Sequence, residues 1–336
     1  MAQKSYRQAI NEALHSEMAR DPNVILMGED ITGGAGGTGV PDAWGGPFGV
    51  TRGLLGAFGP DRVRDTPISE AAFIGAAAGA ALTGLRPVAE IMFIDFLGVC
   101  LDQIMNQAAK FRYMFGGRAR TPLVIRATYG AGTRAGSQHT QALHPILTHI
   151  PGLKVVMPSN PYDAKGLLIE AIRDDDPVMF LEHKMLYDMV GEVPDRSYTV
   201  PFGEARVARD GKDVLLVGLG RMVQVAEEAA RQLSEKGISA CVIDPRTTSP
   251  LDEETLMEFT EEIGRVVIVD EANPRCSVAA DISAMLCERC FGALKGPIRM
   301  VTAPHTPVPY APNLEDAYIP SHSRVVDAAL SLLKNR

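Results

Sequence analysis

The sequence predicts an α/β protein that folds into two domains. Its 336 residues are about twice the length that a domain of ordinary size needs. Apolar residues make up 46% of the chain and charged residues 22%, which is enough apolar material to fill a core in each domain. Segments of helical periodicity alternate with short apolar runs, and this alternation favours a parallel sheet with helices on both faces.

The first domain is expected over residues 1 to 187. Apolar positions recur at helical spacing between residues 5 and 20, with Ser5 as the expected N-cap. A buried strand at residues 23 to 27 should lead into Glu29 and Asp30, and open α/β sheets bind ligands at such carboxyl ends. Further along we expect a helix that starts at Glu70, strands at 87–91, 123–127, 155–156 and 178–181, and helical segments at 95–113 and 162–173.

Residues 188 to 203 are expected to link the domains, because glycine and proline lie there among charged residues. The second domain, residues 204 to 336, is expected to be a smaller three-layer α/β sandwich. Gly218 and Gly220 begin a partial dinucleotide-binding pattern, but its third glycine position is Val223. Close helix-to-strand approach is therefore not expected, and an NAD-dependent oxidoreductase stays an alternative that the pattern supports only in part.

Charge and composition restrict the partners and the compartment. The formal net charge is −8 and no basic run offsets it, which argues against a nucleic-acid surface. No signal-type segment and no stretch long enough for a membrane span occur, so we expect a cytosolic protein. The five cysteines are scattered, and Cys287 with Cys290 forms a lone CxxC pair without the further ligands of a zinc site. We expect reduced cysteines.

Glu70 is the carboxylate that stands out in the first domain, because it precedes a long run of small apolar residues. At a helix start it is either a structural group, stabilised by the free N–H groups and the helix dipole, or a catalytic acid with shifted pKa. Gly75, Gly79 and Gly84 in the following helix each cost about 1 kcal/mol in helix propensity. We expect that another backbone or helix approaches them closely.

Residues 33 to 49 contain eight glycines and the chain's only tryptophan, Trp44. A long loop of this composition is either functional or disordered, and the tryptophan favours a functional surface loop. His139, His144 and His149 are five residues apart, so on a helix they would not share one metal-binding face. His139 follows a glycine-rich turn after a strand, and from the pattern alone it is either a structural hydrogen-bonding group or a site residue.

Several motifs, in this order, resemble the β subunits of thiamine-diphosphate-dependent 2-oxo acid dehydrogenase complexes and of their acetoin dehydrogenase relatives. They span most of the chain: Gly28-Glu29-Asp30, Asp65-Thr66-Pro67-Ile68-Ser69-Glu70, Gly84-Leu85-Arg86-Pro87-Val88-Ala89-Glu90, Gln138-His139-Thr140-Gln141, Pro151-Gly152-Leu153-Lys154-Val155-Val156 and Asp163-Ala164-Lys165-Gly166-Leu167. The resemblance implies a transketolase-like pyrimidine-binding domain followed by a transketolase C-terminal domain, in an α2β2 heterotetramer.

The resemblance also implies roles for individual residues. Glu70 would hydrogen-bond the pyrimidine N1′ of thiamine diphosphate, Phe96 would lie against the pyrimidine ring, and Glu29 would be a carboxylate near the cofactor. His139 would stabilise anionic intermediates or act on the lipoyl group. The α subunit would hold the diphosphate and Mg²⁺, since this chain lacks the Gly-Asp-Gly…Asn motif. A structural K⁺ would lie near Leu123, Ala171, Asp174 and Asp176, because hard cations prefer oxygen ligands.

The long glycine-rich loop at residues 33 to 49 is more similar to the acetoin dehydrogenase branch of this family. We therefore expect a β subunit that helps to cleave acetoin and passes the acetyl unit to a lipoyl-bearing dihydrolipoamide acyltransferase core. Oxidative decarboxylation of pyruvate or of a branched-chain 2-oxo acid is the first alternative. A non-catalytic assembly subunit, in which Glu70 only starts a helix, is the second.

Overall fold

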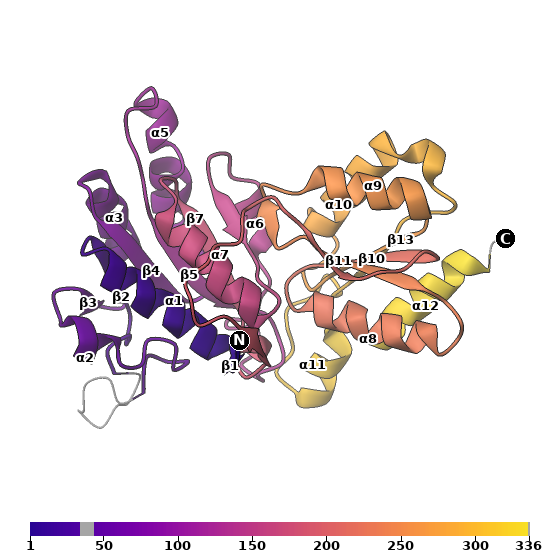
Figure 1. Ribbon diagram of the computed structural model, residues 1–336, viewed down its shortest axis with the longest axis horizontal. Coiled ribbons are helices and arrows are strands. Elements are labelled where there is room, and N and C mark those ends of the chain that lie inside the picture. Colours follow the sequence, from indigo (N-terminus) through magenta and orange to yellow (C-terminus); the bar gives the residue numbers. More distant parts are fainter. Residues whose placement is uncertain (34–43, 335–336) are drawn as a thin grey trace. The chain divides into compact units, whose positions relative to one another are not determined.

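The computed structural model describes residues 1–33 and 44–334, which form two units (Figure 1). Unit 1 contains residues 1–129 and 146–202, and unit 2 contains residues 130–145 and those from 203 on. The expected bounds, 1–187 and 204–336, differ from these units at two segments. The expected linker belongs to unit 1 up to Phe202, and its strand β8 (Val190–Val193) pairs with β1 (Ala2–Ser5). The segment 130–145 clusters with unit 2 instead of unit 1.

The sheet of unit 1 is parallel, with the strand order β6-β7-β5-β4-β2-β3. Every residue of β5 and of β7 is buried, as expected for central strands covered on both faces. The strands are β2 (Val24–Gly28), β3 (Val63–Asp65), β4 (Arg86–Phe93), β5 (Val124–Tyr129), β6 (Lys154–Val156) and β7 (Val178–His183). The predicted α/β fold class is confirmed.

The helices of this part of the chain begin mostly where the sequence predicts. Ser5 forms a capping box with Gln8 at the start of the first helix, and Asn160 caps the helix after β6. The helices are α1 (Tyr6–Arg20), α2 (Leu54–Phe58), α3 (Glu70–Leu82), α4 (Leu97–Asp102), α5 (Phe111–Met114), α6 (His144–Thr148) and α7 (Pro161–Arg173). The helical region predicted at 95–113 is confirmed, and it changes type along its length: a 3₁₀ turn (Ile94–Phe96) precedes α4, and a π-helix (Gln103–Ala108) follows it.

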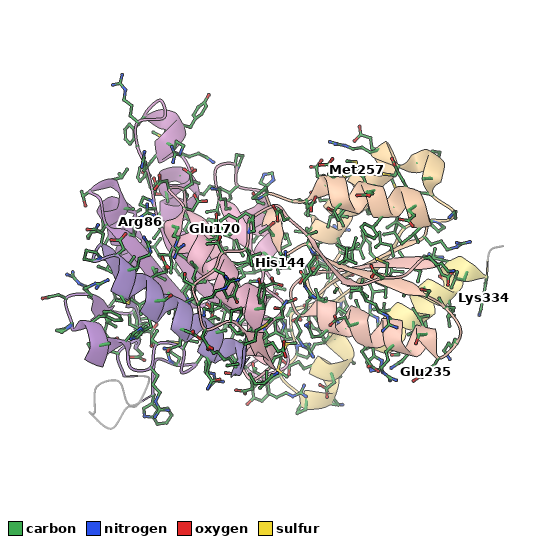
Figure 2. All side chains as sticks on the ribbon, viewed as in Figure 1. Arg86, His144, Glu170, Glu235, Met257 and Lys334 are labelled. Atoms are coloured by element: carbon green, nitrogen blue, oxygen red, sulfur yellow. The ribbon has the colours of Figure 1, made fainter. Side chains whose placement is uncertain are left out.

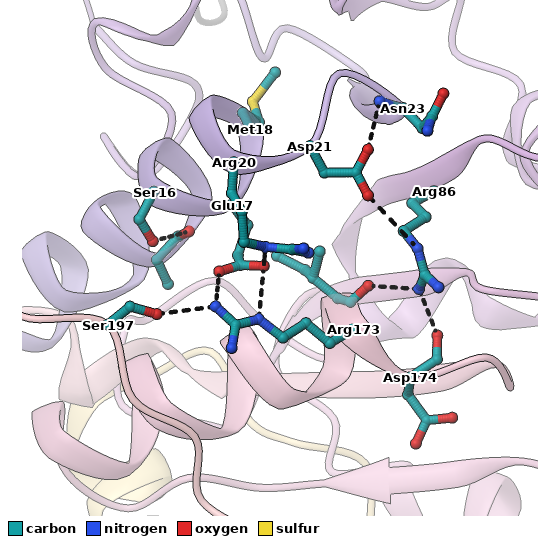
Figure 3. Close-up of polar contacts among 12 residues, drawn as sticks. Ser16, Glu17, Met18, Arg20, Asp21, Asn23, Arg86, Arg173, Asp174 and Ser197 are labelled. Carbon is teal, nitrogen blue, oxygen red and sulfur yellow. Dashed lines mark hydrogen bonds and ion pairs between the residues drawn. The ribbon is translucent and has the colours of Figure 1, made fainter.

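Helices α1 and α7 lie side by side and are joined by an ion pair between Arg173 and the buried carboxylate of Glu17 (Figure 3). Glu17, which is 1% exposed, accepts from Nε and Nη2 of Arg173 at 3.0 and 2.6 Å and from Nε of Arg20 at 2.7 Å. Arg86, at the start of β4, donates to the carbonyls of Ile172 and Asp174 at 3.0 and 2.9 Å. These contacts fix the amino-terminal side of the sheet, away from the ends where ligands bind.

Unit 2 is a three-layer α/β sandwich, as predicted. Its strand order is β14-β13-β10-β11-β9, with only the edge strand β9 antiparallel. One apolar cluster packs α8 and α12 on the sheet, and a second packs α9 and α10 on it. The elements are β9 (Arg206–Arg209), β10 (Val214–Gly218), α8 (Met222–Ser234), β11 (Ala240–Asp244), β12 (Thr247–Ser249), α9 (Glu253–Ile263), β13 (Val266–Asp270), α10 (Val278–Arg289), β14 (Arg299–Thr302), α11 (Pro312–Tyr318) and α12 (His322–Leu333).

Two predictions about glycines need correction. A Cβ on Gly79 would meet no heavy atom of the described residues within 4 Å, so no close approach explains that glycine. Gly84 instead has φ +101°, which suits the turn after α3. In unit 2, a Cβ on Gly218 would lie 2.7 Å from the backbone of Val223, so β10 and α8 approach closely without a third glycine. None of the helices in the described residues is long and apolar enough to cross a membrane.

Candidate active site

The carboxyl ends of β2, β3 and β4 are aligned in unit 1. Gly28 pairs with Asp65 on β3 and with Glu90 on β4. A Cβ at position 28 would lie 2.9 Å from the carbonyl oxygen of Glu90, so only glycine fits there. Asp30 has a φ of +56°, in the left-handed region. The chain therefore turns tightly as soon as β2 ends, and Glu29 is the first residue beyond the strand.

Glu29 and Glu70 interact at this edge of the sheet. Glu70 is the first residue of α3 and is 8% exposed, and the side chain of the preceding Ser69 makes no capping hydrogen bond. Burial raises the pKa of Glu29, and the negative charges of Asp30 and Glu70 raise it further. Within the described residues, neither Glu29 nor Glu70 has a hydrogen bond or ion pair to its carboxylate. The site thus contains two close acids without a neutralising cation.

This arrangement is suited to moving protons. Partial burial and the neighbouring acids raise the pKa of Glu29, so this carboxyl keeps its proton to a higher pH than an isolated one does. A raised pKa brings a carboxyl closer to the range in which general acids and bases work. Cys100 on α4 is no competing nucleophile, because burial and the charge of Glu70 raise the pKa of its thiol to about 12.

Phe96 belongs to an aromatic cluster that follows β4. Its ring contacts that of Phe93 edge to face, with centroids 5.8 Å apart, and Phe93 contacts Phe48 in the same way at 5.6 Å. The ammonium of Lys184 lies 5.1 Å from the centre of the Phe93 ring. Phe96 is half-buried at the end of the 3₁₀ turn. The aromatic residue predicted for the site therefore follows the carboxyl end of β4 directly.

Sequence reasoning missed a buried charge cluster in the same sheet, made of Glu90, Arg126, Glu182 and Tyr187. Arg126 on β5 donates from Nε and Nη2 to the two carboxylate oxygens of Glu182 on β7, at 2.6 and 2.8 Å. Its Nη1 donates to Glu90 on β4, and the hydroxyl of Tyr187 donates to Glu182 at 2.8 Å. The signal was visible, because a charged residue interrupts each of three apolar strands.

The cluster carries more acid than base. Burial raises the pKa of Glu90, although the charge of Arg126 opposes that shift. For Arg126 itself burial alone would lower the pKa, but the charges of Glu182 and Glu90 raise it overall. The guanidinium therefore stays charged and ties together the neighbouring strands β4, β5 and β7, of which β4 also contributes to the carboxylate edge.

His139 lies in the segment 130–145, which three buried acids of unit 2 hold in place. Asp270, at the end of β13, is 3.0 Å from Nε2 of His144, the histidine labelled in Figure 2. Glu271 accepts from the backbone N–H of Ala131 at 2.5 Å, and Glu315 on α11 accepts from that of Gly132 at 2.7 Å. All three carboxylates come from residues at most 3% exposed.

The charge of Asp270 is stabilised by its neighbours. Burial alone would raise the pKa of Asp270, but His144 and the backbone N–H groups of Ala272 and Ala279 lower it overall. His139 is half-buried within this segment, and its N–H donates to the carbonyl of Gly136 at 3.4 Å. His139 thus belongs to unit 2, whereas Glu29, Glu70 and Phe96 belong to unit 1.

The four residues predicted to hold potassium lie near the amino ends of β5 and β7, whereas Glu29 and Glu70 lie at the carboxyl ends of the strands. The carbonyl of Leu123 accepts from the N–H of Val178 at 2.9 Å, and that of Ala171 accepts from the N–H of Asp174 at 3.3 Å. Asp174 pairs with Lys154 at 2.5 Å, and Asp176 pairs with Arg112. The two carboxylates thus already have cationic partners, and no group of three His, Cys, Asp or Glu side chains in the described residues suits a metal ion. The potassium site stays a prediction.

Of the loop at residues 33 to 49, residues 34–43 lie outside the described residues. Trp44 is 58% exposed, and the N–H of Thr51 donates to the carbonyl of Gly45 at 2.9 Å. The second half of the loop is therefore an ordered turn with an exposed indole. The functional role predicted for the loop is not tested by these contacts.

The fold and the domain order define a two-domain protein of the transketolase type. Residues 2–189 match the transketolase pyrimidine-binding domain, and residues 203–325 match the transketolase C-terminal domain. The chain belongs to the family of proteins that combine these two domains. A solved structure described as a split-gene transketolase, an inactive β4 tetramer, has a TM-score of 0.78 and 23% identity and covers 98% of both chains. That likeness shows the shared fold.

Curated relatives match nearly the full length. The β subunit of acetoin:2,6-dichlorophenolindophenol oxidoreductase from Cupriavidus necator is 61% identical over 335 residues, 99% of each chain. The subunit of the same name from Bacillus subtilis is 56% identical over 331 residues, 98% of this chain and 97% of the relative. The B. subtilis pyruvate dehydrogenase E1 component subunit beta is 42% identical over 335 residues, 99% of this chain and 100% of the relative.

Proposed function

We propose that this chain is the catalytic β subunit of a thiamine-diphosphate-dependent enzyme that cleaves acetoin. The observation that carries the proposal is the identity of 61% and 56% to acetoin:2,6-dichlorophenolindophenol oxidoreductase β subunits. The pyruvate and 2-oxoisovalerate dehydrogenase β subunits of B. subtilis are only 42% and 41% identical. The partners would be an α subunit, in an α2β2 heterotetramer, and a lipoyl-bearing acyltransferase core.

The proposed reaction breaks the carbon–carbon bond between the carbonyl and carbinol carbons of acetoin. One half leaves as acetaldehyde, and the other leaves as an acetyl group on a lipoyl sulfur. The acetyl carbon is oxidised, and the lipoyl disulfide is reduced to a thioester and a thiol, so electrons balance without a further oxidant. In an assay, 2,6-dichlorophenolindophenol can replace the lipoyl group as the electron acceptor.

The described residues fit the pyrimidine end of thiamine diphosphate. A carboxyl that is nearly buried and has no described partner, Glu70, can hydrogen-bond a ring nitrogen, and Phe96 offers an aromatic face. When bound, the cofactor supplies a thiazolium carbon that becomes nucleophilic after losing its proton. Glu70 would hold the proton that the ring nitrogen shares, and Glu29 would exchange a proton with it. His139 would stabilise negative charge during acetyl transfer, and Mg²⁺ with the diphosphate would belong to the α subunit.

The test is to co-produce the chain with an α-type subunit and to supply acetoin, pyruvate and 2-oxoisovalerate separately, with and without thiamine diphosphate. We expect cofactor-dependent turnover of acetoin at least about tenfold faster than that of either oxo acid, a ratio within reach of pocket discrimination. Faster turnover of an oxo acid would replace acetoin by that substrate. No turnover of any of the three would favour the assembly role, and NAD binding by the isolated chain would favour the oxidoreductase alternative.

A further inference from the structure

A cavity of about 440 Å³ in unit 1 lies apart from the carboxylate edge described above. It opens between the first turns of α1 and the turn that follows Trp44. Its lining includes Arg7, Asn11, Trp44, Arg52 and Asp188. This volume lies within the range of about 300–1,000 Å³ that small-molecule sites occupy.

The walls of the cavity are held in place by the protein itself. The amide nitrogen of Asn11 donates to the carbonyls of Val50 and Arg52 at 2.7 and 2.9 Å, which ties the turn to α1. Arg7 pairs with Asp188 at 2.9 Å, and its guanidinium lies 5.6 Å from the centre of the Tyr187 ring. A ligand would therefore meet a preformed site and would need little ordering of the chain.

The cavity offers a ligand two kinds of group, guanidinium groups and an aromatic ring. The guanidinium of Arg52 has no hydrogen bond or ion pair within the described residues, and Nε of Arg7 is a buried donor without a partner. Asp188 is the one carboxylate of the lining, and its side chain is 92% exposed, so two guanidinium groups face a single solvated acid. The indole of Trp44 is 58% exposed on the same cavity.

We propose that this cavity binds a small organic anion that carries a flat ring, of the kind that a nucleoside monophosphate represents. The planar fork of an arginine matches phosphate or carboxylate oxygens two at a time. An exposed indole provides a stacking surface for a planar ring. The proposal does not depend on acetoin cleavage, because no residue of the cavity belongs to the carboxylate edge.

Trp44 makes the test specific, because it is the only tryptophan of the chain. The chain is labelled with 5-fluorotryptophan and titrated with AMP, with adenosine and with inorganic phosphate, alone and assembled with the unlabelled α subunit. The fluorine resonance reports on the cavity, and calorimetry gives the affinity. We expect AMP to bind at least about tenfold more tightly than adenosine or phosphate. Only AMP has both a phosphate for the arginines and a ring that can stack on Trp44.

Arg52→Gln removes the open guanidinium and leaves the carbonyl that Asn11 binds. It should abolish the advantage of AMP over adenosine, while Arg118→Gln, at another exposed arginine of unit 1, should not. Three results would overturn the proposal: a fluorine shift equal to that produced by sodium chloride at the same ionic strength, unchanged AMP affinity in Arg52→Gln, or AMP binding that disappears on assembly with the α subunit. The last result would identify the cavity as a subunit contact.

Discussion

Both units place acids at the carboxyl ends of their parallel strands, but they use them differently. In unit 2, Asp270 ends β13 and Glu271 follows it, and their carboxylates contact the segment 130–145 or the turn after the strand. In unit 1, Glu29 follows β2 and Glu70 starts α3, and neither carboxylate has a partner within the described residues. Position in the fold is similar, whereas the number of partners differs.

The difference separates structural acids from acids available for chemistry. A buried carboxylate that accepts several N–H bonds stays ionised, as the lowered pKa of Asp270 shows. A partly buried carboxyl beside other acids instead favours its protonated form, and this is why the pKa of Glu29 is raised. The paired carboxylate stabilises a segment, whereas the unpaired carboxyl holds its proton more tightly than an isolated one does. The cluster around Arg126 combines the two situations, because both of its carboxylates contact the guanidinium and yet two acids share one cation.

The largest effect is expected from Glu70→Gln. If Glu70 exchanges a proton with the cofactor, acetoin turnover by the reconstituted complex should fall by about 10²–10⁴-fold. The melting temperature of the chain should change little, because no described partner is lost. Glu192→Gln on the exposed part of β8 is the matched control and should retain activity. A fully active Glu70→Gln enzyme would put Glu70 in the same structural class as Asp270.

Removal of Arg126 should produce the largest loss of stability. Arg126→Met leaves Glu90 and Glu182 buried without their cation, which should lower the free energy of unfolding by about 3–5 kcal/mol. Urea denaturation of the full chain measures the loss. Adding Glu90→Gln and Glu182→Gln removes the uncompensated charges and should restore much of the stability. If the triple variant is no more stable than Arg126→Met, lost packing and not charge explains the effect.

A smaller loss is expected from Glu315→Gln in unit 2. Glu315 is fully buried and accepts from the N–H groups of Gly132 and Arg134 and from Nη1 of Arg134. Loss of the charge should cost about 1–3 kcal/mol and increase hydrogen exchange within residues 130–145. The adjacent Asp316 pairs with the same arginine but its side chain is 64% exposed, so Asp316→Asn should cost at most about 1 kcal/mol. Equal effects of the two variants would contradict the view that the buried carboxylate of Glu315 holds the segment 130–145 in place.

The smallest effect concerns the pH dependence of stability. The pKa of Glu29 is raised above 4.5 in the folded chain, so the folded state binds its proton more tightly than the unfolded state does. Stability should therefore fall as pH rises from about 4.5 through the raised value. Glu29→Gln should be slightly more stable than the wild type at neutral pH, and the difference should vanish toward acidic pH. A difference that grows on acidification would mean that Glu29 is stabilised as an ion.

The sequence predicted the helices and strands better than the side-chain contacts between residues far apart in the chain. Helical spacing and Ser5 located α1, and the apolar runs located the strands, because those signals are local. The changes of helix type between residues 95 and 113 were not predicted, because 3₁₀, α and π geometry have no distinct amino-acid composition. Glu70 and Glu29 were singled out as site candidates through position and motif, and their roles stay predictions. The Arg126 cluster and the acids that hold the segment 130–145 were not, because their partners are up to 183 residues apart in the chain.

The most direct test of the central claim needs no substrate. The rate at which the C2 proton of thiamine diphosphate exchanges with deuterium is measured in complexes assembled with the wild-type chain, Glu70→Gln or Glu192→Gln. If Glu70 is the catalytic acid, exchange should slow by about 10²-fold or more in Glu70→Gln alone. Equal exchange rates in all three complexes would contradict that role and leave Glu70 as a residue that only starts α3.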